Sequence, residues 1–291
     1  MSNIGNTPMV RLDRSNIYMK LEGHNPSGSI KDRSINNMIN NINNDILNTS
    51  TTCLVTSGSA GLALYNVYNE LDIKSDALVV LPLKYSKKTN PSLLLSKQYI
   101  KIHDSFESLI QSQKKDNMPR FRVLLIDDEF INILHDTEEA VNKNGWTLLD
   151  QHHNMDCVDC HEITAKEILH QLPGVTDVVC TTGTGGTAAG LIKYLPDSVN
   201  IHARTSVSGE IDGLGDVGRY DNFCDTQLIT GYYNCEYNHD DAIKYMNYIK
   251  DKHLLSVGES TGVALWLANE INVRPNMNIV VISADGFMLS D

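Results

Sequence analysis

Short apolar runs alternate with segments of helical pattern along the whole chain. The runs contain consecutive apolar residues, many of them Val or Ile, as expected of strands that are buried on both faces. They cover residues 18–22, 53–56, 77–81, 123–126, 177–182, 201–207 and 279–283. Helical patterns lie between them at 61–71, 161–172, 242–252 and 261–271. This alternation predicts an α/β fold built on parallel sheets.

An Asn-rich segment, residues 35–50, keeps a helical pattern. Its apolar residues at 35, 38, 39, 42 and 46 line one face of a helix. Asn lowers the intrinsic helix propensity, so we expect packing to stabilise this helix. The polar, Lys-containing residues 111–120 are predicted to form an exposed loop.

Charge and hydropathy narrow the class of protein. The 291 residues carry 24 basic and 36 acidic side chains, a net charge of -12, without a long basic block. Nucleic acid is therefore not an expected partner. The longest apolar stretches fall far short of the ~20 residues of a membrane-spanning helix, and residues 1–16 lack the pattern of a signal peptide. These features predict a cytoplasmic protein with one large domain or two closely associated ones, and no membrane partner.

Cysteine spacing suggests a metal or haem site only weakly. Six cysteines are spread unevenly, which favours reduced thiols over a disulfide framework. Cys157, Cys160 and His161 match the spacing of covalent haem attachment and, without the His, half of a zinc site. No second pair completes a zinc site. We therefore expect no metal, and ordinary thiols at the start of a helix.

A glycine-rich segment, residues 180–190, follows an apolar run and opens a helical pattern. Glycines let the backbone approach an anion, and a helix N-terminus supplies free N–H groups and a positive partial charge. A phosphate site is the natural interpretation. Gly183, Gly185 and Ala188 also satisfy a looser dinucleotide fingerprint, although Arg204 stands in the region where that fold expects a carboxylate. A tight turn without a ligand is the third interpretation.

Two further junctions carry candidate chemistry. Lys31 follows a turn at residues 25–29 and begins the Asn-rich helix, where a desolvated amine would suit Schiff-base chemistry. A solvated surface lysine is the alternative. The hydroxyl-rich residues 56–61 lie at a strand-to-helix junction that suits capture of a carboxylate by backbone N–H groups, or a plain Ser cap.

Taken together, these segments occur in the order found in one family. Residues 4–12, 20–33, 56–61, 149–154, 183–187 and 258–262 resemble the pyridoxal-phosphate-dependent cysteine synthases and the catalytic core of cystathionine β-synthase. The resemblance implies a fold-type II enzyme, with two parallel-sheet α/β domains and the cofactor in the cleft between them. It implies a larger cofactor-binding domain, 1–33 with 146–291, and a smaller mobile domain, 34–145.

The resemblance also assigns roles to residues. Lys31 would form the Schiff base with pyridoxal 5'-phosphate and later act as acid and base at the substrate α-carbon. Ser260 would meet the pyridine nitrogen as a neutral partner. The phosphate would be held by Gly183, Thr184, Gly185, Gly186 and Thr187. The substrate carboxylate would be bound by Thr56, Ser57, Gly58, Ser59, Ala60 and Gln151.

Two features bear on substrate choice. The family loop normally reads Thr-Ser-Gly-Asn-Thr-Gly, and here Ser59 and Ala60 replace its Asn and Thr. Because that Asn bonds the cofactor's ring oxygen and that Thr contacts substrate, we expect altered substrate choice or weakened activity. Arg219 follows a Gly-rich stretch and is either a contact for a phosphorylated serine or a surface arginine.

The implied reaction is β-replacement on an activated serine, with cysteine formed from O-acetylserine and sulfide through an aminoacrylate intermediate. Cystathionine formation, use of O-phosphoserine and cysteine desulfhydration are related alternatives. The departure at Ser59 and Ala60 also keeps a low-activity sensor or scaffold as an alternative. A dinucleotide-dependent oxidoreductase would leave Lys31 unexplained. The family further implies a homodimer.

Overall fold

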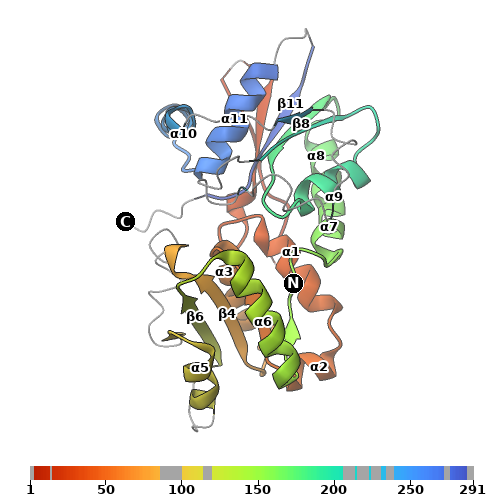
Figure 1. Ribbon diagram of the computed structural model, residues 1–291. Coiled ribbons are helices and arrows are strands. Elements are labelled where there is room, and N and C mark those ends of the chain that lie inside the picture. Colours follow the sequence, from red (N-terminus) through yellow and green to blue (C-terminus); the bar gives the residue numbers. More distant parts are fainter. Residues whose placement is uncertain are drawn as a thin grey trace. The chain divides into compact units, whose positions relative to one another are not determined.

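The computed structural model describes residues 3–13, 15–85, 100–113, 120–205, 214, 223, 231–233, 239–271 and 276–286 (Figure 1). The chain divides into two compact units, residues 1–34 with 151–291 and residues 35–150. The domain boundaries predicted from sequence lay at 33/34 and 145/146. Each unit contains its own sheet with helices, so the predicted α/β class with parallel sheets is confirmed.

The larger unit is built on a six-stranded sheet of order β1-β2-β11-β8-β9-β10. Only β1 among these described strands runs antiparallel to its neighbour, β2. The strands are β1 Met9–Arg11, β2 Ile17–Leu21, β8 Asp177–Thr181, β9 Asn200–Arg204, β10 Gly231–Tyr233 and β11 Ile279–Ser283. The helices are η1 Glu22–His24, α7 Asp156–Asp159, α8 His161–Gln171, α9 Gly186–Tyr194, α10 His239–His253 and α11 Glu259–Ile271.

Consecutive apolar residues in these strands serve two separate cores. Val178 and Val280 pack in a cluster with residues of α8 and α9. Val179 and Val281, their chain neighbours, pack on the opposite face with residues of α10 and α11. Figure 1 shows the two pairs of helices on either side of this sheet. Side chains alternate between the faces of a strand, so continuous apolar runs are what a doubly covered sheet requires.

The smaller unit contains a five-stranded parallel sheet of order β5-β6-β4-β3-β7. Its strands are β3 Thr52–Val55, β4 Ala77–Pro82, β5 Ile100–His103, β6 Phe121–Ile126 and β7 Thr147–Leu148. Its other elements are α2 Asn44–Thr49, α3 Ser59–Glu70, η2 Leu83–Tyr85, α5 Phe106–Gln113 and α6 Phe130–Asn144. Helix α1, Lys31–Asn41, starts in the larger unit and continues into this one.

The prediction of a single helix over residues 35–50 was wrong. Helix α1 ends at Asn41, and α2 begins only at Asn44. Between them the Asn43 side chain accepts a hydrogen bond from the Asp45 backbone N–H at 2.8 Å, which makes Asn43 the N-cap of α2. Asn side chains compete with helical hydrogen bonds in this way, so the apolar periodicity continued across a real break.

The predicted loop at 111–120 needs a correction as well. Residues 111–113 form the last turn of α5, and residues 114–119 lie outside the described part of the chain. The run predicted at 201–207 ends as a strand at Arg204. None of the helices in the described ranges has the length and apolar character needed to cross a membrane.

Candidate active site

Lys31 is placed by a turn that is tied to the end of strand β11. Gly28 adopts a φ of +86°, a conformation that glycine adopts readily, and α1 then begins at Lys31. The Ile30 N–H donates to the Ala284 carbonyl at 2.7 Å, and Ser29 forms a bridge with Asp285. The start of α1 is thereby fixed beside the carboxyl edge of the larger sheet.

The Lys31 amine is available for chemistry. Burial lowers the pKa of Lys31 from its ordinary value of 10.5, because desolvation disfavours the ammonium form. Within the described ranges, its Nζ forms no hydrogen bond or ion pair. A lysine with a depressed pKa and no charged partner presents more neutral amine at a given pH, and the neutral amine is the nucleophile.

The glycine-rich loop forms an anion cradle at the N-terminus of α9. Gly185 is its N-cap, with a φ of +86°, and Gly186 is the first helical residue. A Cβ at Gly186 would lie 2.8 Å from the Cys157 carbonyl oxygen, so the missing side chain lets α9 approach α7. The first N–H groups of a helix lack intrahelical partners and carry positive partial charge, which favours a phosphate.

A cavity in the larger unit brings several of the predicted residues together. Lys31, Gln151, Thr184, Gly186 and Thr187 all line it. The remaining lining residues are Ile30, Ser34, Cys157 and His161. The cavity therefore has an amine, an amide and two hydroxyls beside the N-terminus of α9. Gly183 and Gly185 lie in the same loop but are not among the lining residues.

Ser260 is fixed at the first turn of α11. It is buried, and its hydroxyl donates to Oδ1 of Asp285 at 3.5 Å. Gly258 packs so closely on the Asp285 carboxylate that a Cβ would lie 2.1 Å from Oδ1. Asp285 also pairs with Ser29, so one short segment contacts both the Lys31 turn and the Ser260 turn. Ser260 does not line the cavity described above.

The predicted carboxylate loop belongs to the smaller unit. The Gly58 N–H donates to the Thr56 hydroxyl at 3.1 Å, and α3 begins at Ser59. Gly58 has a φ of 149°, which favours glycine at this position. Ala60 is 1% exposed. Arg219, the other predicted substrate contact, lies outside the described residues.

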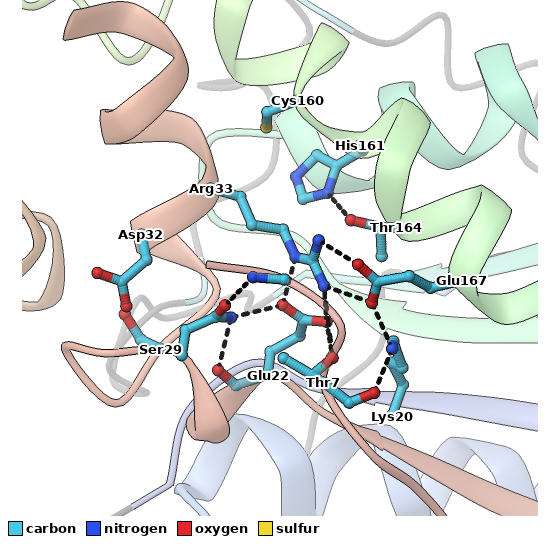
Figure 2. Close-up of polar contacts among 12 residues, drawn as sticks. Thr7, Lys20, Glu22, Ser29, Asp32, Arg33, Cys160, His161, Thr164 and Glu167 are labelled. Carbon is cyan, nitrogen blue, oxygen red and sulfur yellow. Dashed lines mark hydrogen bonds and ion pairs between the residues drawn. The ribbon is translucent and has the colours of Figure 1, made fainter. Parts of the chain in front are cut away.

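Sequence reasoning missed a buried ion cluster that begins two residues after Lys31 (Figure 2). Arg33 contacts Glu22 at 2.6 and 2.8 Å and Glu167 at 2.8 and 3.0 Å. Lys20 donates to Glu167 at 2.5 Å and to the Thr7 carbonyl at 2.6 Å. Although burial raises the pKa of the Glu167 carboxyl, the hydrogen bonds from Arg33 and Lys20 lower it to about 2. The cluster fixes α1, α8 and the β2–η1 segment to one another.

His161 was likewise overlooked, except as part of a haem-like spacing. The structure places it at the start of α8, 2% exposed, with Cys157 and Cys160 buried as free thiols beside it. Burial, together with the nearby positive charges of Arg33 and Lys31, lowers the pKa of His161 to about 3. The imidazole is therefore neutral at physiological pH.

The residues of the cavity fit pyridoxal phosphate. Lys31 supplies the amine that an aldehyde requires, and the N-terminus of α9 with Thr184 and Thr187 supplies donors for a phosphate. A lysine beside a phosphate cradle on a parallel α/β sheet defines the class of fold-type II pyridoxal-phosphate enzymes.

The comparison with known families agrees with this class. Residues 1–285 match the family described as pyridoxal-phosphate dependent enzyme. The chain belongs to that family, and pyridoxal phosphate is its cofactor. The dinucleotide interpretation of the glycine-rich loop is therefore set aside.

Individual relatives have names within the predicted group. Cysteine synthase B of Escherichia coli K12 is 30% identical over 203 residues, which cover 66% of this chain and 59% of that protein. Cystathionine beta-synthase of Saccharomyces cerevisiae is 29% identical, covering 67% of this chain and 38% of that protein. The match thus spans less than two thirds of the length of either relative. Among solved structures, a hydrogen sulfide-producing enzyme from Fusobacterium nucleatum superposes with a TM-score of 0.79 and 26% identity, covering 97% of this chain and 96% of the other.

Proposed function

We propose that the protein catalyses β-replacement on an activated serine, most simply cysteine synthesis from O-acetylserine and sulfide. The observation that carries the proposal is the partner-free Lys31 amine in one cavity with the N-terminus of α9 and Gln151. Relatives named cysteine synthase B and cystathionine beta-synthase support the same reaction class. A homodimer in the cytoplasm is part of this proposal, and light scattering of the purified protein would test the dimer.

The chain's own residues divide the work. Thr184, Gly185, Gly186 and Thr187, with Gly183 before them, hold the cofactor phosphate through N–H and O–H donors. Ser260 offers a neutral hydroxyl to the ring nitrogen, and Ser59 stands where the family bonds the ring oxygen. When bound, pyridoxal phosphate supplies an aldehyde for the substrate amine and a ring that accepts electron density from the α-carbon.

Lys31 performs the proton transfers. It first anchors the cofactor through its Nζ atom, and the freed amine then takes the proton from the substrate α-carbon. Its lowered pKa suits this role, because a protonated amine cannot act as a base. Gln151, with Thr56, Ser57, Gly58 and Ala60 of the smaller unit, binds the substrate carboxylate. Arg219 would contact the leaving group if that group is a phosphate.

A second candidate is release of hydrogen sulfide from cysteine. The Fusobacterium nucleatum protein that covers 97% of this chain is named as a hydrogen sulfide-producing enzyme. The two reactions use the same Lys31 chemistry and differ in the group that leaves the β-carbon.

The deciding experiment is an absorption titration of the purified protein with pyridoxal phosphate, followed by O-acetylserine, O-phosphoserine, serine or cysteine. We expect a visible cofactor band that shifts with the true donor, and cysteine as the product when O-acetylserine and sulfide are present. Lys31→Ala should remove the covalent adduct trapped by borohydride, whereas Lys193→Ala, an exposed control on α9, should keep it. A band that no donor shifts would favour the scaffold alternative. A protein that takes up no cofactor would refute the proposal.

A further inference from the structure

His161 lies between two threonine hydroxyls, one in its own helix and one in the phosphate cradle. Its Nδ1 is 3.1 Å from Oγ1 of Thr164, and its Nε2 is 3.2 Å from Oγ1 of Thr187. Figure 2 shows the first of these contacts, with the ring beside the Arg33 cluster. Thr187 belongs to the first turn of α9 and lines the cavity, whereas Thr164 does not. The imidazole therefore connects a buried hydroxyl to a hydroxyl that faces the ligand.

The burial of Thr164 decides which way these hydrogen bonds run. Thr164 is fully buried, and His161 is its hydroxyl's single partner within the described ranges. If the ring carried its proton on Nδ1, the Thr164 O–H would have no acceptor, and a buried donor without an acceptor is costly. The satisfied arrangement has Thr164 donating to Nδ1. A neutral ring then carries its proton on Nε2 and donates it to Thr187.

The same reasoning excludes a charged ring. An imidazolium would donate from both nitrogens and would again leave the Thr164 proton without an acceptor. Burial and the charges of Arg33 and Lys31 oppose protonation as well, and the thiols nearest the ring, Cys157 and Cys160, are buried. Cys160 in particular stays a neutral thiol, because burial raises its pKa far above the physiological range.

We propose that His161 is a positioning residue that accepts from Thr164 and donates to Thr187, so that the Thr187 hydroxyl donates its own proton to the phosphate group of the cofactor. The inference rests on the proposed function, since it takes the cradle to hold that phosphate. A phosphate offers only acceptors to the cradle, so a Thr187 hydroxyl that donated back to His161 would present a lone pair to an anion. The relay removes that unfavourable orientation before the ligand arrives.

Two glycines keep the relay at hydrogen-bonding distance. A Cβ at Gly190 would lie 2.5 Å from the His161 Cβ, and one at Gly186 would lie 2.8 Å from the Cys157 carbonyl. Positions 186, 187 and 190 share one face of α9. The spacing that resembles haem attachment thus has another explanation, because the residues around His161 form the surface on which α9 packs.

The first test reads the tautomer directly. The full chain labelled with 15N-histidine is examined by long-range 15N–1H correlation at pH 7, with and without pyridoxal phosphate, and His161→Gln identifies the signal. We expect a neutral ring with its proton on Nε2 in both states. A proton on Nδ1, or a charged ring, would overturn the proposal whether or not the cofactor binds.

The second test separates the relay from general damage to the fold. Thr164→Val removes the first donor outside the cavity and should weaken pyridoxal phosphate binding between about threefold and tenfold. Binding of pyridoxal, which lacks the phosphate, should not change. Thr137→Val is the matched control, because Thr137 of the smaller unit is equally buried and its hydroxyl has no partner within the described ranges. His161→Met should weaken binding in the same phosphate-dependent way, and His161→Gln, which keeps a donor, should recover part of it.

The outcomes distinguish this inference from the proposed function. Equal pyridoxal phosphate affinity in the wild type, Thr164→Val and His161→Met would refute the relay while leaving the enzyme assignment intact. Equal weakening for pyridoxal phosphate and pyridoxal would also refute it, because the effect would not depend on phosphate. A wild type that binds neither compound would refute the proposed function, and the tautomer would then decide the direction of the hydrogen bonds alone.

Discussion

Gly190 of α9 lies against His161 of α8 so closely that a Cβ on the glycine would come within 2.5 Å of the histidine Cβ. The Val158 carbonyl oxygen would lie at the same distance. Neither atom is the far end of a flexible side chain, so neither can move aside without shifting a helix. The helix that begins with the phosphate cradle is therefore held in place by the absence of a side chain at position 190.

Gly190→Ala should destabilise the protein by about 1–3 kcal/mol and weaken cofactor binding, because α9 must move away from α8. The change in free energy of unfolding would be measured by urea titration, and the affinity by absorption. Gly174→Ala is the control, since its Cβ would meet only the Asn278 amide at 3.4 Å. Equal stability of the two variants would contradict the packing argument.

Glu167→Gln should cost about 3–5 kcal/mol, because it leaves Lys20 and Arg33 buried without one of their counter-charges. Glu162→Gln, on the exposed side of the same helix, removes a surface pair with Lys166 and should cost less than ~1 kcal/mol. Urea titrations of both variants at pH 7 would compare these costs. Similar losses would show that the cluster adds nothing beyond a surface pair.

The stability supplied by Glu167 should depend on pH in a defined window. The pKa of its carboxyl falls from 4.5 to about 2 on folding, so the unfolded chain binds more protons between these values. The stabilisation is complete above pH 4.5 and is lost as the pH falls through about 2. The difference between wild type and Glu167→Gln should therefore shrink across this window, and a constant difference would contradict the assignment.

Lys31→Met should stabilise the cofactor-free protein at pH 7. The pKa of Lys31 is lowered in the folded state, so between that value and 10.5 the unfolded chain binds more protons and the lysine destabilises the fold. Each unit of lowering corresponds to about 1.4 kcal/mol. Thermal or urea unfolding at pH 7, 9 and 10.5 should show the advantage of Lys31→Met decreasing as the pH rises. A variant less stable than wild type at pH 7 would contradict this reasoning.

The sequence predicted the part of the fold that apolar runs encode. Strands β2, β3, β4, β6, β8, β9 and β11 each contain such a run, and each was predicted within a few residues. Strands β1, β7 and β10 were missed, because two or three residues carry no detectable periodicity. Strand β5 alternates Ile with Lys and His, so it lacked the continuous run that identified the others.

The candidate site was predictable where a local motif carries it. Lys31 and the glycine-rich loop each combine a turn with a helix start, which is visible in a few consecutive residues. The Arg33 to Glu167 contact joins residues 134 positions apart, and no local pattern reveals such a pair. His161 gave a misleading pattern, since its spacing from Cys157 and Cys160 matched a haem motif while its partners, Thr164 and Thr187, lie outside that motif.

The substitutions in the smaller unit's loop give a prediction about activity. Asn in place of Ser59 restores the amide that the family uses at the cofactor's ring oxygen, and Ser59 is only partly buried, so the larger side chain has room. Ser59→Asn should raise kcat/KM with O-acetylserine and sulfide by roughly tenfold, the value of a hydrogen bond to a charged oxygen. Ser59→Ala, which removes the hydroxyl without adding an amide, should give no gain. Ala60→Thr should behave differently, because Ala60 is 1% exposed and added atoms in a filled site cost about 1–3 kcal/mol. We therefore expect the gain from Ser59→Asn alone, a lower unfolding midpoint in Ala60→Thr, and no larger gain in the double variant. Steady-state kinetics and urea unfolding of the three variants would test this, and an unchanged kcat/KM in Ser59→Asn would show that position 59 does not limit the reaction.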